Sequence, residues 1–237
     1  MKIFSKIKSY IKKDKKIFAK GLCFEKLFLI FLIGSIIGAY YEQILNLFRV
    51  YKYTGDIVWE YRRGVIYGPF NVIYGFGAVV MTKILLSKEY KWYEILLYGC
   101  ILGGGIEYIV SFLQETFTHT ISWDYSNKPF NINGRTTIPY MFVWGLFCLL
   151  FVKIIYPFIS NKIEKIPYNL GMLLTKIMVI FMVFNMAISW TAIIRQTLRK
   201  NNIPAFTKVG EFYDEYYTDE YLSKYFPNMI RKEFVND

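Results

Sequence analysis

Apolar residues in this chain are gathered into long blocks that are separated by short polar stretches. An α-helix rises 1.5 Å per residue, so ~20 apolar residues are needed to cross the ~30 Å hydrocarbon core of a bilayer. Five blocks reach that length: residues 27–48, 65–86, 93–113, 138–159 and 170–194. The pattern therefore predicts an all-α, polytopic membrane protein with about five transmembrane helices.

Two of the five blocks contain polar residues. Asn71 and Lys83 fall in the second, and Lys176 and Asn185 fall in the fifth. Little sequence remains between the blocks, so a sizeable soluble domain is excluded. Tyrosines and tryptophans gather near the ends of the blocks, where their rings favour the headgroup layer.

We divide the chain into an N-terminal segment 1–24, a region 25–160 that holds the first four spans, a segment 161–195 with the fifth span, and a tail 196–237 with one or two short helices around 209–225.

The net charge of +11 is concentrated at the N-terminus, where residues 1–20 hold eight lysines and one acid, Asp14. Ile3, Ile7 and Ile11 recur there at helical spacing. Segment 1–24 is therefore predicted to be a basic amphipathic helix on an anionic membrane surface. Nucleic acid is the alternative partner of a basic arm, and we expect none.

Lysines also predict the orientation, because cytoplasmic loops are enriched in Lys and Arg. We expect the N-terminus and the loops near 87–92 and 160–169 in the cytoplasm of a cell-membrane protein. The loops near 49–64 and 114–137, and the tail, would then lie outside. Arg195, Arg199 and Lys200 at the start of the tail argue mildly against this last placement.

The first four blocks show an internal repeat of a two-span hairpin, residues 27–86 and 93–159. Each copy has a GxxxGxxxE motif, an aromatic–acid–aromatic triplet, an arginine beside a glycine, and a proline followed by an aromatic–Gly pair. The motifs are Gly34/Gly38/Glu42 and Gly99/Gly103/Glu107, Trp59–Tyr61 and Trp123–Tyr125, Arg63–Gly64 and Gly134–Arg135, and Pro69/Tyr74/Gly75 and Pro139/Trp144/Gly145. A two-span unit places both copies in the same orientation, as in parallel membrane repeats.

Residues four apart lie on one stripe of a helix, and glycines on such a stripe let helices approach closely. Glu42 and Glu107 lie on these stripes, so we expect them to meet near the pseudo-twofold axis, opposite Arg63 and Arg135. Charged residues inside a bilayer are costly and usually have a task. The alternative is that two Glu–Arg pairs only hold the hairpins together. The predicted substrate or ion pathway comprises Glu42, Glu107, Arg63, Arg135, Glu115, Asp124, Tyr125 and Asn131.

Other chemistry is sparse. His119, the single histidine, has Glu115 and Asp124 near it and could bind a metal, but a loop residue is the simpler interpretation, and we predict no metal site. Cys23, Cys100 and Cys148 form no CxxC pair and are expected to be packing residues. There is no GxxxxGK[ST], GxSxG or HExxH motif, so the chain is no P-loop ATPase, and no cofactor is indicated.

Several longer motifs resemble the bacterial family of putative ABC-transporter type IV, or CmpB-type, permeases. They are residues 63–69 (RGVIYGP), 74–77 (YGFG), 123–126 (WDYS), 130–135 (FNINGR) and 226–229 (FPNM), together with Glu42 and Glu107. The chain departs from the family pattern at Asn71 and Ser122, which leaves the charged positions unchanged.

The resemblance implies a permease that works with a separate ATPase subunit. Of the inside loops, only 160–169 is long enough to meet such a subunit. Two alternatives stay open. One is a membrane-embedded enzyme that acts on a lipid-linked or envelope substrate with Glu107, Glu115 or Asp124 as acid or base. The other is a structural or sensory assembly protein. A homo-oligomer also remains open.

Overall fold

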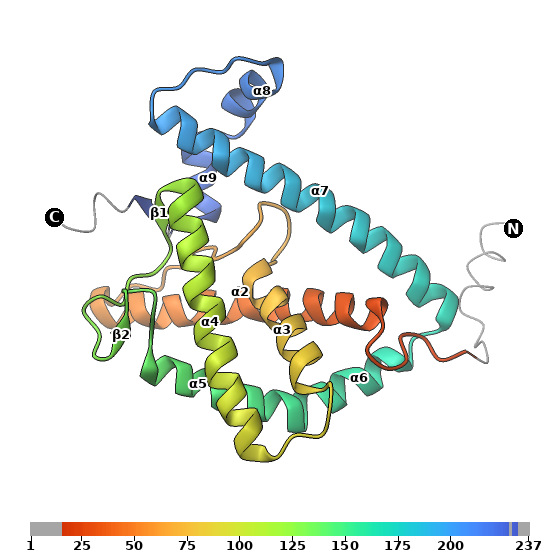
Figure 1. Cartoon of the computed structure of the whole chain (residues 1–237). Coiled ribbons are helices and arrows are strands. Elements are labelled where there is room, and N and C mark those ends of the chain that lie inside the picture. Colours follow the sequence, from red (N-terminus) through yellow and green to blue (C-terminus); the bar gives the residue numbers. More distant parts are fainter. Residues whose placement is uncertain (1–15, 228, 232–237) are drawn as a thin grey trace, which may run out of the picture.

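The computed structural model describes residues 16–227 and 229–231 and is helical over most of this length (Figure 1). Residues 1–15, where most of the predicted basic helix falls, lie outside the described part. The helices are α2 (Phe24–Thr54), α3 (Val72–Leu85), α4 (Trp92–Thr118), α5 (Ile138–Leu150), the π-helical turn η1 (Phe151–Ile155), α6 (Tyr156–Glu164), α7 (Tyr168–Lys200), α8 (Lys208–Tyr216) and α9 (Asp219–Tyr225). The strands are β1 (Thr120–Ile121), β2 (Asn131–Ile132), β3 (Thr136–Thr137) and β4 (Ile230–Arg231).

Four helical stretches are long and apolar enough to cross a membrane: Phe24–Thr54, Trp92–Thr118, Ile138–Glu164 and Tyr168–Lys200. The predicted all-α, polytopic membrane architecture is confirmed. All four stretches run beyond the predicted blocks, because polar residues lower the local hydropathy without ending a helix. The second block differs from the prediction. It is helical only from Val72 to Leu85, 14 residues or about 21 Å, which is short for a complete span.

The first part of that block, residues 65–71, is a non-helical segment in which Val65, Ile66 and Phe70 are buried. Gly68 has a positive φ of 76° and is followed by Pro69, a combination that interrupts a helix. Ile66, which is 2% exposed, donates its backbone N–H to Ser189 Oγ at 2.9 Å. The Asn185 side chain accepts from the Tyr67 N–H at 3.2 Å and donates to the Tyr67 carbonyl at 2.7 Å. These bonds to α7 satisfy backbone groups that could not remain unpaired at membrane depth.

The helical stretch Ile138–Glu164 is continuous but irregular at its centre. Pro157 stands in the first turn of α6 and has no N–H to donate to the carbonyl of Lys153. The π-helical turn η1 lies directly before it and accommodates the missing bond. At the far end of this stretch, the buried Lys26 of α2 forms an ion pair of 2.6 Å with Glu164.

Glycines set the packing of two helical hairpins, α2 with α3 and α4 with α5. Gly38 faces the ring of Tyr74, and Gly103 faces the ring of Trp144. A methyl group on either glycine would overlap the facing ring. Gly34 faces Ala78, and Gly99 faces Cys148 in the same manner. The close approach that the GxxxG spacing predicts is thus made within each hairpin.

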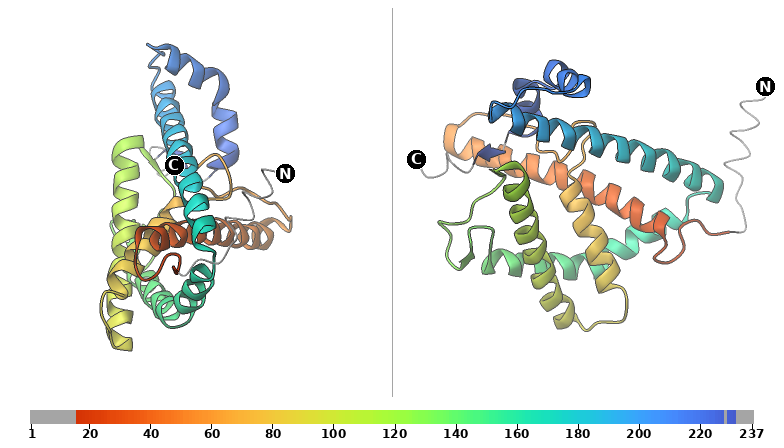
Figure 2. Two further views of the ribbon diagram at one scale, coloured as in Figure 1. Left: turned by 90° about the vertical axis from the view of Figure 1, so that its right-hand side faces the viewer. Right: turned by 45° about the horizontal axis from the view of Figure 1, so that its top comes forward.

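The loops after α2 and α4 lie toward the tail, whereas residues 16–23 lie near the start of α7 (Figure 2). At one end, β1 from the loop after α4 pairs antiparallel with β4 of the tail, and Tyr61 from the loop after α2 stacks on Tyr225 of α9 at 5.7 Å. Phe18 packs against Gly171 at the start of α7, beside the Lys26–Glu164 pair. The tail therefore shares one end with both hairpin loops, and residues 16–23 lie at the other.

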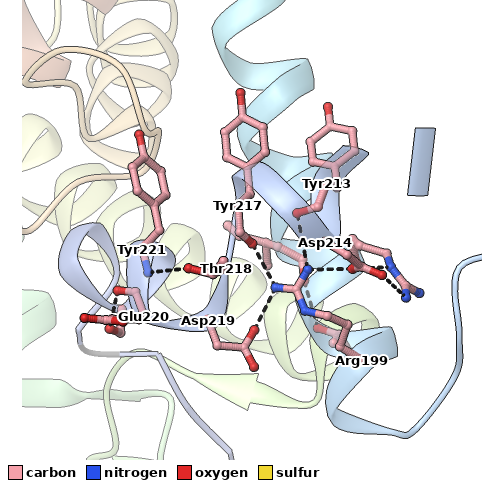
Figure 3. A network of polar contacts seen from close by, with 12 residues as sticks. Arg199, Tyr213, Asp214, Tyr217, Thr218, Asp219, Glu220 and Tyr221 are labelled. Carbon is pink, nitrogen blue, oxygen red and sulfur yellow. Dashed lines mark hydrogen bonds and ion pairs between the residues drawn. The ribbon is translucent and has the colours of Figure 1, made fainter. Parts of the chain in front are cut away.

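The tail folds back on α7 as two short helices, α8 and α9 (Figure 3). Arg195 and Arg199 of α7 both bind the carboxylate of Asp214, at 2.6 and 2.8 Å, and Arg199 also binds Asp219 at 2.7 Å. Tyr67 and Tyr217 join their hydroxyls at 2.8 Å. The tail thus holds α7 against the buried segment 65–71.

A candidate acidic site between the hairpins

Glu42 lies on α2 and is bonded within its own hairpin. Its carboxylate accepts a hydrogen bond of 2.5 Å from the hydroxyl of Tyr74 on α3. The ring of Tyr74 can reach it because Gly38, one helical turn before Glu42, leaves the space that a side chain would otherwise fill. The GxxxE spacing therefore positions both the aromatic residue and the acid that it binds.

Glu107 occupies the equivalent position on α4. Its carboxylate accepts from Thr136 Oγ1 at 2.7 Å and, at the longer distance of 3.5 Å, from the hydroxyl of Tyr125. Trp144, whose ring packs on Gly103, lies close to this carboxylate. Each glutamate thus lies beside the aromatic residue that packs on the glycine of its own stripe.

The two hairpins meet at these aromatic residues. The rings of Tyr74 and Trp144 lie 6.1 Å apart, and the carboxylates of Glu42 and Glu107 are close enough to interact electrostatically. The structure therefore places the two glutamates of the repeat in neighbouring hairpins, each beside one of the two rings in contact. Tyr41 and Tyr140, which are exposed, stand at the rim of the cluster, beside Tyr74 and Tyr125 respectively.

The two arginines have partners other than the expected ones. Arg135 forms an ion pair with Glu115 at 2.6 Å and lies over the rings of Tyr108 and Phe112. Arg63 lies over Tyr61 and Tyr225, with its guanidinium 4.0 Å from the first ring.

Within residues 16–227 and 229–231, no ion pair involves Glu42 or Glu107. The Glu–Arg pairing assumed for these residues was wrong, because Arg135 is bound by Glu115 and packs on two rings of α4, and Arg63 packs on the rings of Tyr61 and Tyr225.

The loop 119–137 contributes the remaining predicted residues. Asp124 accepts from the N–H and hydroxyl of Ser126, at 2.8 and 2.6 Å, and Asn131 binds the carbonyls of Ser126 and Lys128 at 3.0 Å each. These two side chains shape the loop and do not join the cluster. Tyr125 does reach it. Burial, and then the charge of Glu107, raise the pKa of the Tyr125 hydroxyl, so it remains a protonated donor at neutral pH.

The prediction from the sequence did not include three residues that lie beside the two glutamates: Tyr74, Trp144 and Thr136. The aromatic–Gly pairs containing Tyr74 and Trp144 were visible as part of the repeat. Their place beside the glutamates depends on contacts between helices. The GxxxE spacing could have identified them. A ring that packs on the glycine of this motif lies one helical turn from the glutamate.

No group of three or more His, Cys, Asp or Glu side chains among the described residues could hold a metal ion. His119 ends α4 with a positive φ of 53°, and its backbone N–H donates to the carbonyl of Glu115 at 3.0 Å. It caps the helix C-terminus, in agreement with the interpretation as a loop residue.

Comparison with known proteins finds one family. A family model described as "Putative ABC-transporter type IV" matches residues 29–190, from the first turns of α2 almost to the end of α7. No curated protein matches the chain, and neither does any solved structure. Because the match includes both hairpins and the fifth long helix, it covers well over half of the sequence. The chain belongs to the ABC-transporter type IV family of that description.

Proposed function

We propose that this transport-related membrane protein carries a cation-binding site formed by Glu42 and Glu107 between its two hairpins. The observation that supports this most is that the two glutamates flank the Tyr74–Trp144 contact between the hairpins, and that their hydrogen-bond donors among the described residues are hydroxyl groups. A charged group inside a bilayer costs roughly 2.5–3.5 kcal/mol on insertion scales, so two uncompensated acids need a counter-charge. A bound cation or a shared proton would supply it.

The surroundings of the carboxylates indicate which cation suits them. Tyr41, Tyr74, Tyr125, Tyr140 and Trp144 surround the pair with aromatic rings, whose faces attract cations. Hydroxyl donors already satisfy part of each carboxylate, which leaves fewer lone pairs for a small, strongly hydrated metal ion. We therefore propose an organic ammonium ion as the preferred ligand.

We also propose that the hairpins are a tandem repeat. The glycine contacts support this, because Gly34, Gly38 and Glu42 meet Ala78 and Tyr74 as Gly99, Gly103 and Glu107 meet Cys148 and Trp144. The register is the same in both pairs. Such a repeat would give the site its approximate symmetry, with one carboxylate from each copy.

The family suggests association with a separate ATPase subunit. We propose that the end holding residues 16–23 faces the cytoplasm and would receive it, in accord with the lysine-rich N-terminus. Between α6 and α7 only residues 165–167 are non-helical, so the predicted coupling segment is largely the end of helix α6. An ATPase would therefore meet helix ends and not a long loop.

The enzyme alternative has less support. Glu115 is paired with Arg135, and Asp124 is occupied by Ser126 in its own loop, so neither is placed as an acid or base. Only Glu107 retains the position that this alternative needs.

Direct binding tests the proposal. The purified protein in detergent micelles would be titrated at constant ionic strength with Na⁺, K⁺, Mg²⁺ and tetramethylammonium while tryptophan fluorescence is followed. We expect a saturable change with tetramethylammonium that is lost in Glu42→Gln and Glu107→Gln. Glu89→Gln, an exposed acid in the loop between α3 and α4, is the matched control and should bind normally. An identical response in all three variants, or no saturable response to any cation, would refute the cation site.

A further inference from the structure

The exposed surface of α8 is divided into an apolar and a charged stripe. Val209, Phe212 and Tyr216 recur at helical spacing and are 62%, 48% and 59% exposed. Phe206 precedes them and is also exposed. Lys208, Glu211 and Glu215 form a second exposed stripe, about 90° around the helix at 3.6 residues per turn. The third side of α8, with Tyr213 and Asp214, packs toward α7.

The position of α8 relative to the membrane follows from α7. Exposed apolar side chains on α7 run from Leu173 to Ile194, roughly 30 Å at 1.5 Å per residue, which equals the thickness of a hydrocarbon core. The next residue is Arg195, and Arg199 follows one turn later. These two arginines therefore lie where the hydrocarbon ends and the headgroup layer begins.

Ion pairs hold α8 at this level. Asp214 of α8 binds both Arg195 and Arg199, at 2.6 and 2.8 Å, and Arg199 also binds the carbonyl of Tyr217 at 2.8 Å (Figure 3). The helix thus lies beside the last turns of α7, next to the end of its lipid-facing surface. At that depth an apolar stripe faces lipid, and a charged stripe beside it faces water.

We propose that α8 is an interfacial helix that rests in the headgroup layer, with Phe206, Val209, Phe212 and Tyr216 in contact with lipid. The partner of this surface is the bilayer at the end of the bundle that carries both hairpin loops. The stripe belongs to a helix that is bonded to the last turns of α7, and aromatic residues favour this layer. This contact would fix the end of α7, and through Tyr217 and Tyr67 the buried segment 65–71.

Photocrosslinking of the full chain tests the contact. Benzoylphenylalanine would replace Phe212 in one variant and Glu215, on the charged stripe of the same helix, in the matched control. Both would be reconstituted into vesicles of phosphatidylethanolamine and phosphatidylglycerol, irradiated and weighed by intact mass spectrometry. We expect phospholipid adducts at position 212 at least fivefold above those at position 215. Equal adducts at both positions, no adduct, or a crosslinked dimer that identifies a second copy as the partner would overturn the proposal.

A second measurement separates lipid contact from folding. The double variant Val209→Ser, Phe212→Ser removes exposed apolar groups, so the melting temperature in detergent should stay within about 2 °C of the parent. In vesicles, amide hydrogen exchange over residues 208–216 should become several-fold faster. Unchanged exchange in vesicles would contradict the interfacial position.

Discussion

The hydroxyl of Tyr74 donates a hydrogen bond of 2.5 Å to the carboxylate of Glu42, across the contact that Gly38 opens between α2 and α3. Its counterpart on the second hairpin is Trp144, which packs on Gly103 and lies beside Glu107. The centroids of these two rings are 6.1 Å apart. The contact between the hairpins is therefore made by the residues that lie beside the two acids.

Removal of the Tyr74 hydroxyl should weaken this contact. Tyr74→Phe keeps the ring on Gly38 but removes a bond to a charged group, which is worth about 1.5–3 kcal/mol. We expect the free energy of unfolding in detergent micelles to fall by that amount. Tyr140→Phe, at the exposed rim of the cluster, is the control and should cost less than about 0.5 kcal/mol. Equal losses in the two variants would show that the Tyr74–Glu42 bond contributes nothing.

Substitution of Gly103 should separate α4 from α5. In Gly103→Ala the new methyl group meets the ring of Trp144, and overpacking of this kind costs about 1–3 kcal/mol. Gly105→Ala, two residues along the same helix, has no atom within 4 Å of the added methyl and should be neutral or slightly stabilising. Thermal denaturation of both variants measures the difference. Should Gly103→Ala melt as the parent does, the close packing at Trp144 is not present in solution.

Asn185 should be essential to the buried segment 65–71. In Asn185→Leu both the N–H and the carbonyl of Tyr67 lose their partner, and each unsatisfied buried group costs about 1–3 kcal/mol. We expect a large fall in thermal stability and faster hydrogen exchange in residues 65–71. Phe184→Leu, an exposed substitution one residue away, provides the control. A small effect in Asn185→Leu would mean that water or lipid headgroups satisfy the segment instead.

Attachment of the tail should depend on pH. The bonds from Arg195 and then Arg199 lower the pKa of Asp214 to about 2. A carboxyl whose pKa is lowered on folding contributes stability above its unfolded pKa, ~3.9, and loses it as the pH falls through the folded value. We therefore expect protease sensitivity of residues 208–225 to rise between about pH 4 and pH 2.

Asp214→Asn is the matching variant for this measurement, performed with an acid-stable protease. It should make the tail sensitive already at neutral pH, because the amide cannot neutralise Arg195 and Arg199. The increase between pH 4 and pH 2 should then disappear. If the variant retains the same acid transition as the parent, another carboxyl is responsible for it.

The sequence alone determined that the chain is a membrane protein, where its long helices lie, and that Glu42 and Glu107 occupy equivalent positions. These features depend on local properties of the sequence, namely the length and composition of apolar blocks and the spacing of residues. Transfer of an apolar block into lipid depends on its length and composition, and a period of four residues places Gly38 and Glu42 on one stripe wherever the helix packs. The family description that matches residues 29–190 agrees with the resemblance found in the motifs.

The tertiary structure decided what the side chains bind. Arg63 was expected to pair with a glutamate of the repeat. Its guanidinium instead lies over the ring of Tyr225, which belongs to the tail helix α9. Residues 65–71 belong to an apolar block, yet they are non-helical, and their bonds to Asn185 and Ser189 of α7 satisfy backbone groups that a helix would have satisfied internally. An apolar composition indicates that a segment is removed from water. It does not distinguish a helix from a buried loop, because both can have the same composition. Which partner satisfies a backbone group or a charge depends on chain segments brought together only by folding, and no local pattern contains that information.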